Sequence, residues 1–145
     1  MEEIIQKLKL DAELYLRAFE QYLNKQTTLK EKTIRNHVSN ASLFVKDYLV
    51  DREQEDVIQG ITSLGMFFTY FYIRKCMWST PSNIKTTAAS IKRFYKYLYE
   101  VNVIQKDDYQ LLCNIIKNDM ESWQYECAVF NGDIEDESYE ELPFY

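Results

Sequence analysis

The sequence is poor in the residues that interrupt regular structure. Its 145 residues include only three glycines, two prolines and three cysteines. So few turn-forming residues argue against a fold of many short strands. A glycine-rich phosphate loop is absent, which excludes the P-loop and dinucleotide-binding fingerprints. The cysteines are odd in number and form no C-x-x-C pair, so we expect neither a disulfide framework nor a zinc site, and a reducing cytoplasm as the compartment.

Long hydrophobic runs are also missing. The most apolar stretch, residues 66–73, is far shorter than the ~20 residues that cross a bilayer. The acidic N-terminus lacks the basic and apolar regions of a secretion signal. We therefore expect no membrane partner. The 46% of hydrophobic residues is nevertheless enough for a core in a chain of this length, which excludes disorder of the whole chain.

Histidine occurs once, at position 37, and this limits the chemistry available to the chain. No Ser-His-Asp or Cys-His nucleophile set can be assembled around it. The carboxylate pairs Asp107-Asp108 and Glu140-Glu141 lie at a helix start and in an acidic tail, where capping and solvation explain them. We expect no enzyme activity, no cofactor, no metal and no small-molecule substrate. His37 itself is expected to pack at the edge of an apolar face.

Hydrophobic periodicity predicts an all-α fold, a compact bundle of about five helices. The predicted helices span residues 4–25, 30–49, 55–75 and 83–101, and a last helix is capped by Asp107 or Asp108 and reaches about Cys127. Ser82 is the expected N-cap of the fourth helix, and Asn102 fits its C-cap. Residues 50–56 are expected to be a loop or a helix start. The bundle occupies residues 1–130, and residues 131–145 form an acidic C-terminal tail.

The third predicted helix is apolar on nearly all sides, which indicates burial or an interface. Its expected core face consists of Val57, Ile61, Leu64, Phe68 and Phe71. Four further apolar residues lie on other sides: Met66, Phe67, Tyr70 and Ile73. Two interpretations follow. The helix is the central one of the bundle, or these four residues form an interface with a protein partner.

The charge is distributed unevenly along the chain. The net charge of −6 matches the six acids of residues 131–145, so residues 1–130 sum to zero and residues 27–106 to +5. On the fourth predicted helix, Lys85, Lys92 and Lys96 fall within about 40° of one another, and Arg93 and Thr86 widen this stripe. A similar line on the second helix, at spacings of 4, 3 and 4, consists of Arg35, Ser39, Ser42 and Lys46. Such lines fit successive phosphates, or they are ordinary solvated faces.

Two segments carry a resemblance to a known family. The first reads Thr28-Leu29-Lys30-Glu31-Lys32-Thr33-Ile34-Arg35-Asn36-His37, followed by Leu43-Phe44 and Tyr48-Leu49. The second reads Ser82-Asn83-Ile84-Lys85-Thr86-Thr87-Ala88-Ala89-Ser90-Ile91-Lys92-Arg93-Phe94-Tyr95-Lys96-Tyr97-Leu98. Over about residues 10–106 the chain resembles the N-terminal core-binding domain of phage integrases and other tyrosine recombinases.

The resemblance implies a SAM-like helical bundle that clasps one side of a DNA duplex, mainly through its backbone. The matching DNA-facing positions are Thr33, Arg35, Asn36, Ser82, Lys85, Thr86, Lys92 and Arg93; projection adds Ser39, Lys46 and Lys96. The family's catalytic domain, with clustered Arg and His and a nucleophilic Tyr, has no counterpart, because the chain ends where it would begin. His37 stands in the family's aromatic slot.

Two functions are therefore expected from the sequence. The first is a non-catalytic module that binds double-stranded DNA, with a recombinase or a second copy as a further partner. The second is a protein-protein interaction or oligomerisation module that has lost DNA binding. The acidic tail is either a solubilising segment or a competitor that lies across the basic stripes and imitates phosphates.

Overall fold

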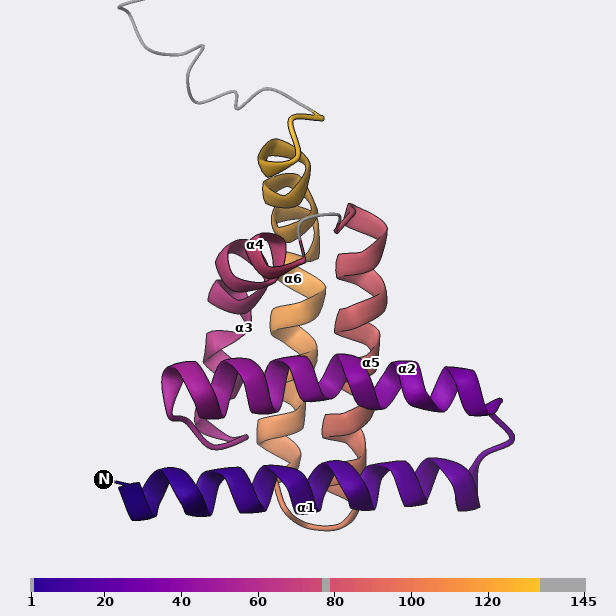
Figure 1. The fold of residues 1–145 in the computed structure, drawn as a ribbon. Helices are drawn as coiled ribbons and strands as arrows, with labels where there is room; N and C mark the ends of the chain where they lie inside the picture. The colour runs from indigo at the N-terminus through magenta and orange to yellow at the C-terminus, as the bar shows by residue number, and fades with distance from the viewer. Residues whose placement is uncertain (1, 77–78, 134–145) are drawn as a thin grey trace, which may run out of the picture.

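The computed structural model describes residues 2–76 and 79–133, and this part of the chain consists of helices and turns without a strand. Its helical pieces join into five segments, which confirms the predicted all-α bundle of about five helices. The first two segments lie side by side and cross the last two at a steep angle, with the third segment at one flank (Figure 1). Of the expected acidic tail, residues 134–145 lie outside the described residues.

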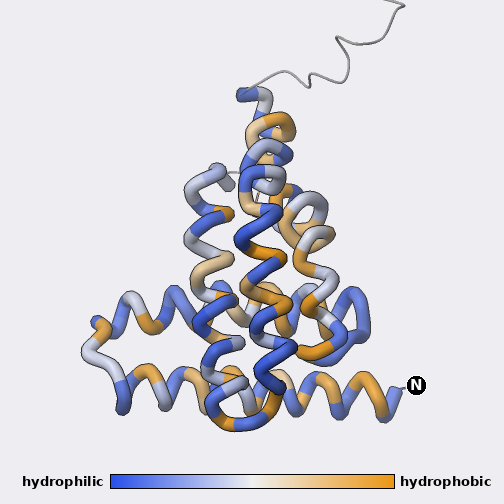
Figure 2. Tube along the Cα trace, turned by 180° about the vertical axis from the view of Figure 1, so that it is seen from behind, coloured by the Kyte–Doolittle hydropathy of each residue, from blue (hydrophilic) through white to orange (hydrophobic). Residues whose placement is uncertain are grey.

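The first layer is a helical hairpin. Helix α1 (Glu2–Gln26) runs antiparallel to α2 (Glu31–Ser42), which continues without a break as the π-helical piece η1 (Leu43–Glu53) (Figure 1). Hydrophobic and hydrophilic residues alternate along α1, as expected for a helix with one buried face (Figure 2). Residues 50–56 were expected to be a loop or a helix start, but residues 50–53 continue the π-helical turns of η1, and Val50 is buried in the core. Gln54, with a left-handed φ of 56°, ends the helix.

The third segment joins four short pieces: η2 (Gln59–Ser63), α3 (Leu64–Met66), η3 (Phe67–Tyr72) and α4 (Ile73–Lys75). It is packed on two sides. The Phe67 ring contacts the Phe44 ring of η1, with ring centres 5.0 Å apart, while Phe68 stacks on Trp123 at 4.7 Å. Phe67 and Ile73 are fully buried in the chain's own core, so their assignment to a partner interface is corrected. Only Met66 and Tyr70 of that set are exposed.

The second layer pairs α5 (Pro81–Glu100) with α6 (Lys106–Phe130) in an antiparallel hairpin (Figure 1). Thr80, rather than the expected Ser82, caps α5, because Pro81 fits the first helical position, where no N–H is needed. The Thr80 Oγ1 accepts from the Asn83 N–H at 3.2 Å, and Asn83 Oδ1 accepts from the Thr80 N–H at 3.0 Å. Helix α5 ends at Glu100 with Val101, rather than the expected Asn102, as its C-cap, and Asn102 takes a left-handed φ of 65° one residue further on.

Helix α6 begins at Lys106, so Asp107 and Asp108 lie inside its first turn and neither is the expected N-cap, and it runs three residues past Cys127. Its N-cap is Gln105, whose backbone N–H donates to Asp108 Oδ2 at 2.9 Å. Asp108 therefore caps the helix from its third position rather than from the cap itself.

The core lies where the two layers cross. The recurrence of apolar residues predicts an inner face of Ile34, Val38, Ala41, Val45 and Leu49 on the second helix, and all of these except the half-buried Val38 are buried in α2 and η1. The inner face predicted on α5, which consists of Ile84, Ala88, Ile91, Tyr95 and Leu98, is buried throughout. Phe19 of α1 meets Phe94 of α5 edge to face, with ring centres 5.2 Å apart. None of the helices in the described residues is long and apolar enough to cross a membrane.

Candidate nucleic-acid interface

The outward face of α5 carries a row of cations. Lys85, Lys92, Arg93 and Lys96 are all exposed, on the side of the helix opposite its buried residues. From Lys85 to Lys96 the row is about 17 Å long at 1.5 Å per residue. That length matches the axial rise of about five phosphates on one DNA strand. We call these four residues the α5 cation row.

The α5 cation row has no acidic partners in the described part of the chain. No carboxylate of residues 2–76 or 79–133 lies within ion-pair distance of any of the four side chains. Their charges are therefore available to an anion that approaches from solvent. Neutralising phosphates with such cations releases counterions, which is the main source of sequence-independent affinity for DNA.

The C-terminal half of the row borders a groove between α5 and the ends of two other helices. Lys92, Arg93 and Lys96 line it on one side, and Tyr22 of α1 and Tyr109 of α6 line it on others. Ala89, one turn before Arg93, is the smallest side chain of the lining and lets a ligand approach the helix backbone closely. The groove thus combines three cations with aromatic rings and one small residue.

One acid closes the groove. Glu100 lies one turn beyond Lys96 and lines the same groove. Its Oε2 accepts a hydrogen bond from the Tyr22 hydroxyl at 3.1 Å, and burial, together with this contact, raises the pKa of Tyr22. A carboxylate repels phosphate, so Glu100 marks the end of the surface that fits a DNA backbone.

A polar network joins α2 to α5 beside the row. The His37 Nδ1 and the Ser90 hydroxyl lie 2.8 Å apart, and Asn40 Nδ2 donates to the same hydroxyl at 3.0 Å. Burial lowers the pKa of His37, and the nearby positive charge of Arg93 lowers it further. His37 is half-buried at the edge of the apolar face, as expected, and fixes the crossing of the two helices.

The basic line on α2 has a different environment. Arg35 Nη1 lies 3.3 Å from Glu31 Oε1, and Lys46 Nζ lies 3.4 Å from Glu13 Oε1 of α1. Arg35 and Ser39 border a hollow with Glu20 and Asp47, and this hollow shares no residue with the groove on α5. The structure therefore brings α2 and α5 together without merging their two basic lines into one surface.

The remaining predicted DNA contacts are polar groups near the ends of these helices. Asn36 of α2 is exposed and Thr33 is half-buried. On α5, Ser82 and Thr86 are exposed, and the Thr86 hydroxyl donates to the Ser82 carbonyl at 3.1 Å. Ser82 thus extends the outward face of α5 toward its N-terminus, and Thr86 lies within the row, directly after Lys85.

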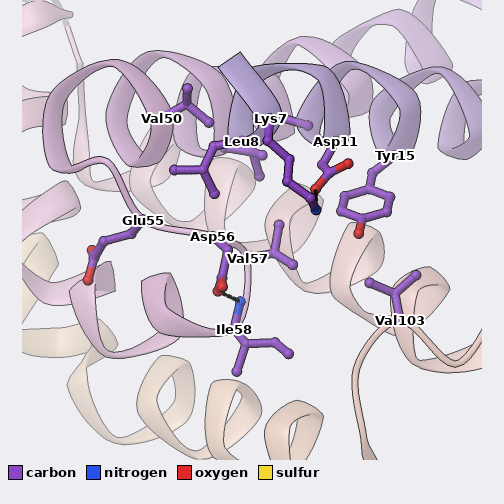
Figure 3. A pocket seen from close by; sticks show the side chains of 12 residues that line it. Lys7, Leu8, Asp11, Tyr15, Val50, Glu55, Asp56, Val57, Ile58 and Val103 are labelled. Atoms are coloured by element: carbon purple, nitrogen blue, oxygen red, sulfur yellow. Dashed lines mark hydrogen bonds and ion pairs between the residues drawn. The ribbon is translucent and has the colours of Figure 1, made fainter. Parts of the chain in front are cut away.

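A second hollow lies between the N-terminal half of α1 and the turn that follows η1 (Figure 3). Its charged side chains are already engaged: Lys7 Nζ lies 3.0 Å from Asp11 Oδ2, Asp56 Oδ1 accepts from the Ile58 N–H at 2.9 Å, and Glu55 Oε1 accepts from the Ser63 hydroxyl at 2.6 Å. Its base is apolar, with buried Val45, Val50 and Val57. Because these charged side chains pair with each other or with nearby polar groups of the chain, the hollow presents no convergent set for a phosphate.

Two further observations bear on the chemistry of the molecule. Among the described residues, no three His, Cys, Asp or Glu side chains gather as metal ligands.

The two helices of the second layer differ in charge. Helix α5 has four cations and one acid, whereas α6 has two cations and five acids.

Sequence reasoning missed three parts of this site. Glu100 could have been predicted from the sequence, because it follows Lys96 by four residues and therefore extends the same stripe. Tyr22 and Tyr109 could not be predicted, since their place beside Lys92 depends on how α1 and α6 pack against α5.

Searches of family models, curated proteins and solved structures found no match to the chain.

Proposed function

We propose that the protein is a non-catalytic DNA-binding module that contacts the duplex backbone through the outward face of α5. The observation that supports this most is the α5 cation row, about 17 Å long and free of acidic partners in the described residues. The resemblance of residues 10–106 to the core-binding domain of tyrosine recombinases points to the same helix and the same function. Double-stranded DNA is the partner, and a recombinase that acts on the same site is a further one.

The chemistry of the row predicts how binding should depend on sequence and salt. Lysine and arginine side chains that reach phosphates carry no base information, so affinity should vary little between duplexes. Four phosphate contacts predict a slope of about −3.6 in log affinity against log salt concentration.

The test is a titration of fluorescent duplexes with full-length protein at low salt, read by anisotropy. Lys92→Ala with Arg93→Ala should weaken binding on every duplex and reduce the salt slope by about two units. Lys9→Ala with Lys117→Ala removes the same charge from exposed positions outside the groove and should leave both values unchanged. Absence of wild-type affinity at low salt would refute the proposal, as would equal effects of the two double variants.

The alternative is a protein-interaction or oligomerisation module. The observation that favours it is the exposure of Met66 (59%) and Tyr70 (43%), two large side chains four residues apart in the third segment. Light scattering separates the two functions. A stable dimer without DNA affinity supports the alternative, and a monomer that shifts DNA supports the first proposal.

A further inference from the structure

A second cationic surface lies away from the α5 groove, where three segments meet. It consists of Arg52 at the end of η1, Met66, Tyr70 and Arg74 of the third segment, and Phe130 at the end of α6. We call these five residues the arginine-aromatic surface. None of them lines the groove on α5, so the surface does not belong to the proposed DNA site.

Arg74 is held between two aromatic rings. Its guanidinium carbon lies 4.0 Å from the centre of the Tyr70 ring and 5.1 Å from that of Phe130. The Arg52 guanidinium lies 5.6 Å from the Tyr70 ring centre. Stacking covers the flat faces of a guanidinium and leaves its N–H edges for an acceptor. One Arg74 edge donates to the Tyr70 carbonyl at 3.2 Å, and the other N–H groups remain for a ligand.

These arginines lack strong acidic partners. No carboxylate in the described part of the chain lies within ion-pair distance of Arg74, and the contact of Arg52 with Glu53 is 4.0 Å long. The apolar members are uncovered as well, with Met66 59%, Tyr70 43% and Phe130 44% exposed. Guanidinium edges beside exposed apolar rings suit a segment that carries both carboxylates and aromatic side chains.

The chain itself supplies such a segment directly beside this surface. Residues 134–145 contain five carboxylates and end in Leu142-Pro143-Phe144-Tyr145. They follow Asp133, three residues after Phe130, whose ring already contacts Arg74. Twelve extended residues reach about 40 Å, whereas the nine residues from Met66 to Arg74 span only about 12 Å of helix. The segment is therefore long enough to fold back along the whole surface.

We propose that residues 134–145 dock in cis on the arginine-aromatic surface, with carboxylates on Arg52 and Arg74 and an aromatic side chain against Met66 and Tyr70. The α5 cation row is the competing location, but its groove contains the carboxylate of Glu100 and no arginine stacked between rings. Docking on the arginine-aromatic surface leaves the α5 row free, so this inference stands independently of DNA binding.

The test uses full-length, ¹⁵N-labelled protein and the heteronuclear NOE of residues 134–145 at low concentration. The wild type should show restrained amides in this segment. Arg52→Gln with Arg74→Gln should lower these NOE values to those of a free chain, and so should 1 M salt. Lys92→Ala with Arg93→Ala is the matched control, since it removes two cations from the α5 row, and it should leave the segment restrained.

A second variant set changes only residues within 134–145. Glu140→Gln with Glu141→Gln and Phe144→Ala should release the segment while the helical bundle stays folded. Free-chain NOE values in the wild type would overturn the proposal. Release by the α5 variant would place the segment on the DNA-binding face and also overturn it. Restraint that appears only as concentration rises would identify a second copy as the occupant, with the same consequence.

Discussion

The basic lines of α2 and α5 have similar sequences and different surroundings. Both place cations and hydroxyls on one side of a helix, yet Arg35 and Lys46 pair with Glu31 and Glu13, whereas the α5 cation row has no carboxylate within ion-pair distance in the described residues. The difference shows that the availability of a cation depends on what neighbouring turns and helices place beside it. Position on a helix face alone does not identify a phosphate contact.

Charge reversal should give the largest effect in this comparison. Lys92→Glu with Arg93→Glu places two acids in the groove and should reduce DNA affinity more than tenfold at low salt. Arg35→Glu with Lys46→Glu changes the net charge of the protein equally and should reduce affinity far less. Anisotropy titrations of both variants on one duplex measure the contrast. Equal losses would mean that only net charge matters and that α5 is not the contact surface.

Removal of one acid should have a moderate and opposite effect. Glu100→Gln keeps an acceptor for the Tyr22 hydroxyl but removes the carboxylate from the groove. We expect about two- to threefold tighter DNA binding, since one phosphate repulsion is lost. Glu31→Gln frees Arg35 on α2 and serves as the control, with unchanged affinity expected. Tighter DNA binding by the Glu31→Gln control would show that only ion pairing keeps the cations of the α2 line from contacting DNA.

The smallest effect is expected at His37, where the two helices meet. Its pKa is lowered in the folded protein, mainly by burial and also by Arg93. Below the ordinary pKa of about 6.5 the unfolded chain binds a proton that the folded chain resists. Folding stability should therefore be complete at neutral pH and fall as pH decreases from about 6.5.

Urea unfolding at pH 7.5 and pH 5.5 measures this effect. The informative quantity is the difference between the wild type and His37→Gln, because it isolates the contribution of this one side chain. The wild type should lose more stability than the variant over this interval. An equal loss in both proteins would show that His37 is not part of the pH response.

Most of the fold was predictable from helical periodicity. The buried faces of α2 and α5 follow from apolar residues that recur every three or four positions, because each helix has one buried side. The third segment does not follow the rule of one buried side, since Phe67 faces η1 and Phe68 faces α6. A helix packed between two neighbours buries two of its sides. Apolar residues such as Phe67 and Ile73 therefore lie outside a single predicted core face and are nevertheless buried in the chain's own core.

The candidate site was predictable only in the part carried by one helix. The α5 cation row follows from the projection of α5 alone, and the structure leaves all four residues exposed. The pairing of Lys46 with Glu13 and the place of Tyr22 beside Lys92 depend on how α1 packs on α2 and α5. Such contacts join distant parts of the sequence, and no local pattern encodes them.

The opposite charges of α5 and α6 have a kinetic consequence. Four cations and one acid on one helix lie beside two cations and five acids on its antiparallel neighbour, so the second layer is an electric dipole. In the field of a polyanion such a dipole turns its positive side forward before contact. The acidic helix would thus speed productive encounters with DNA without touching it, by reducing the fraction of approaches made with the wrong face.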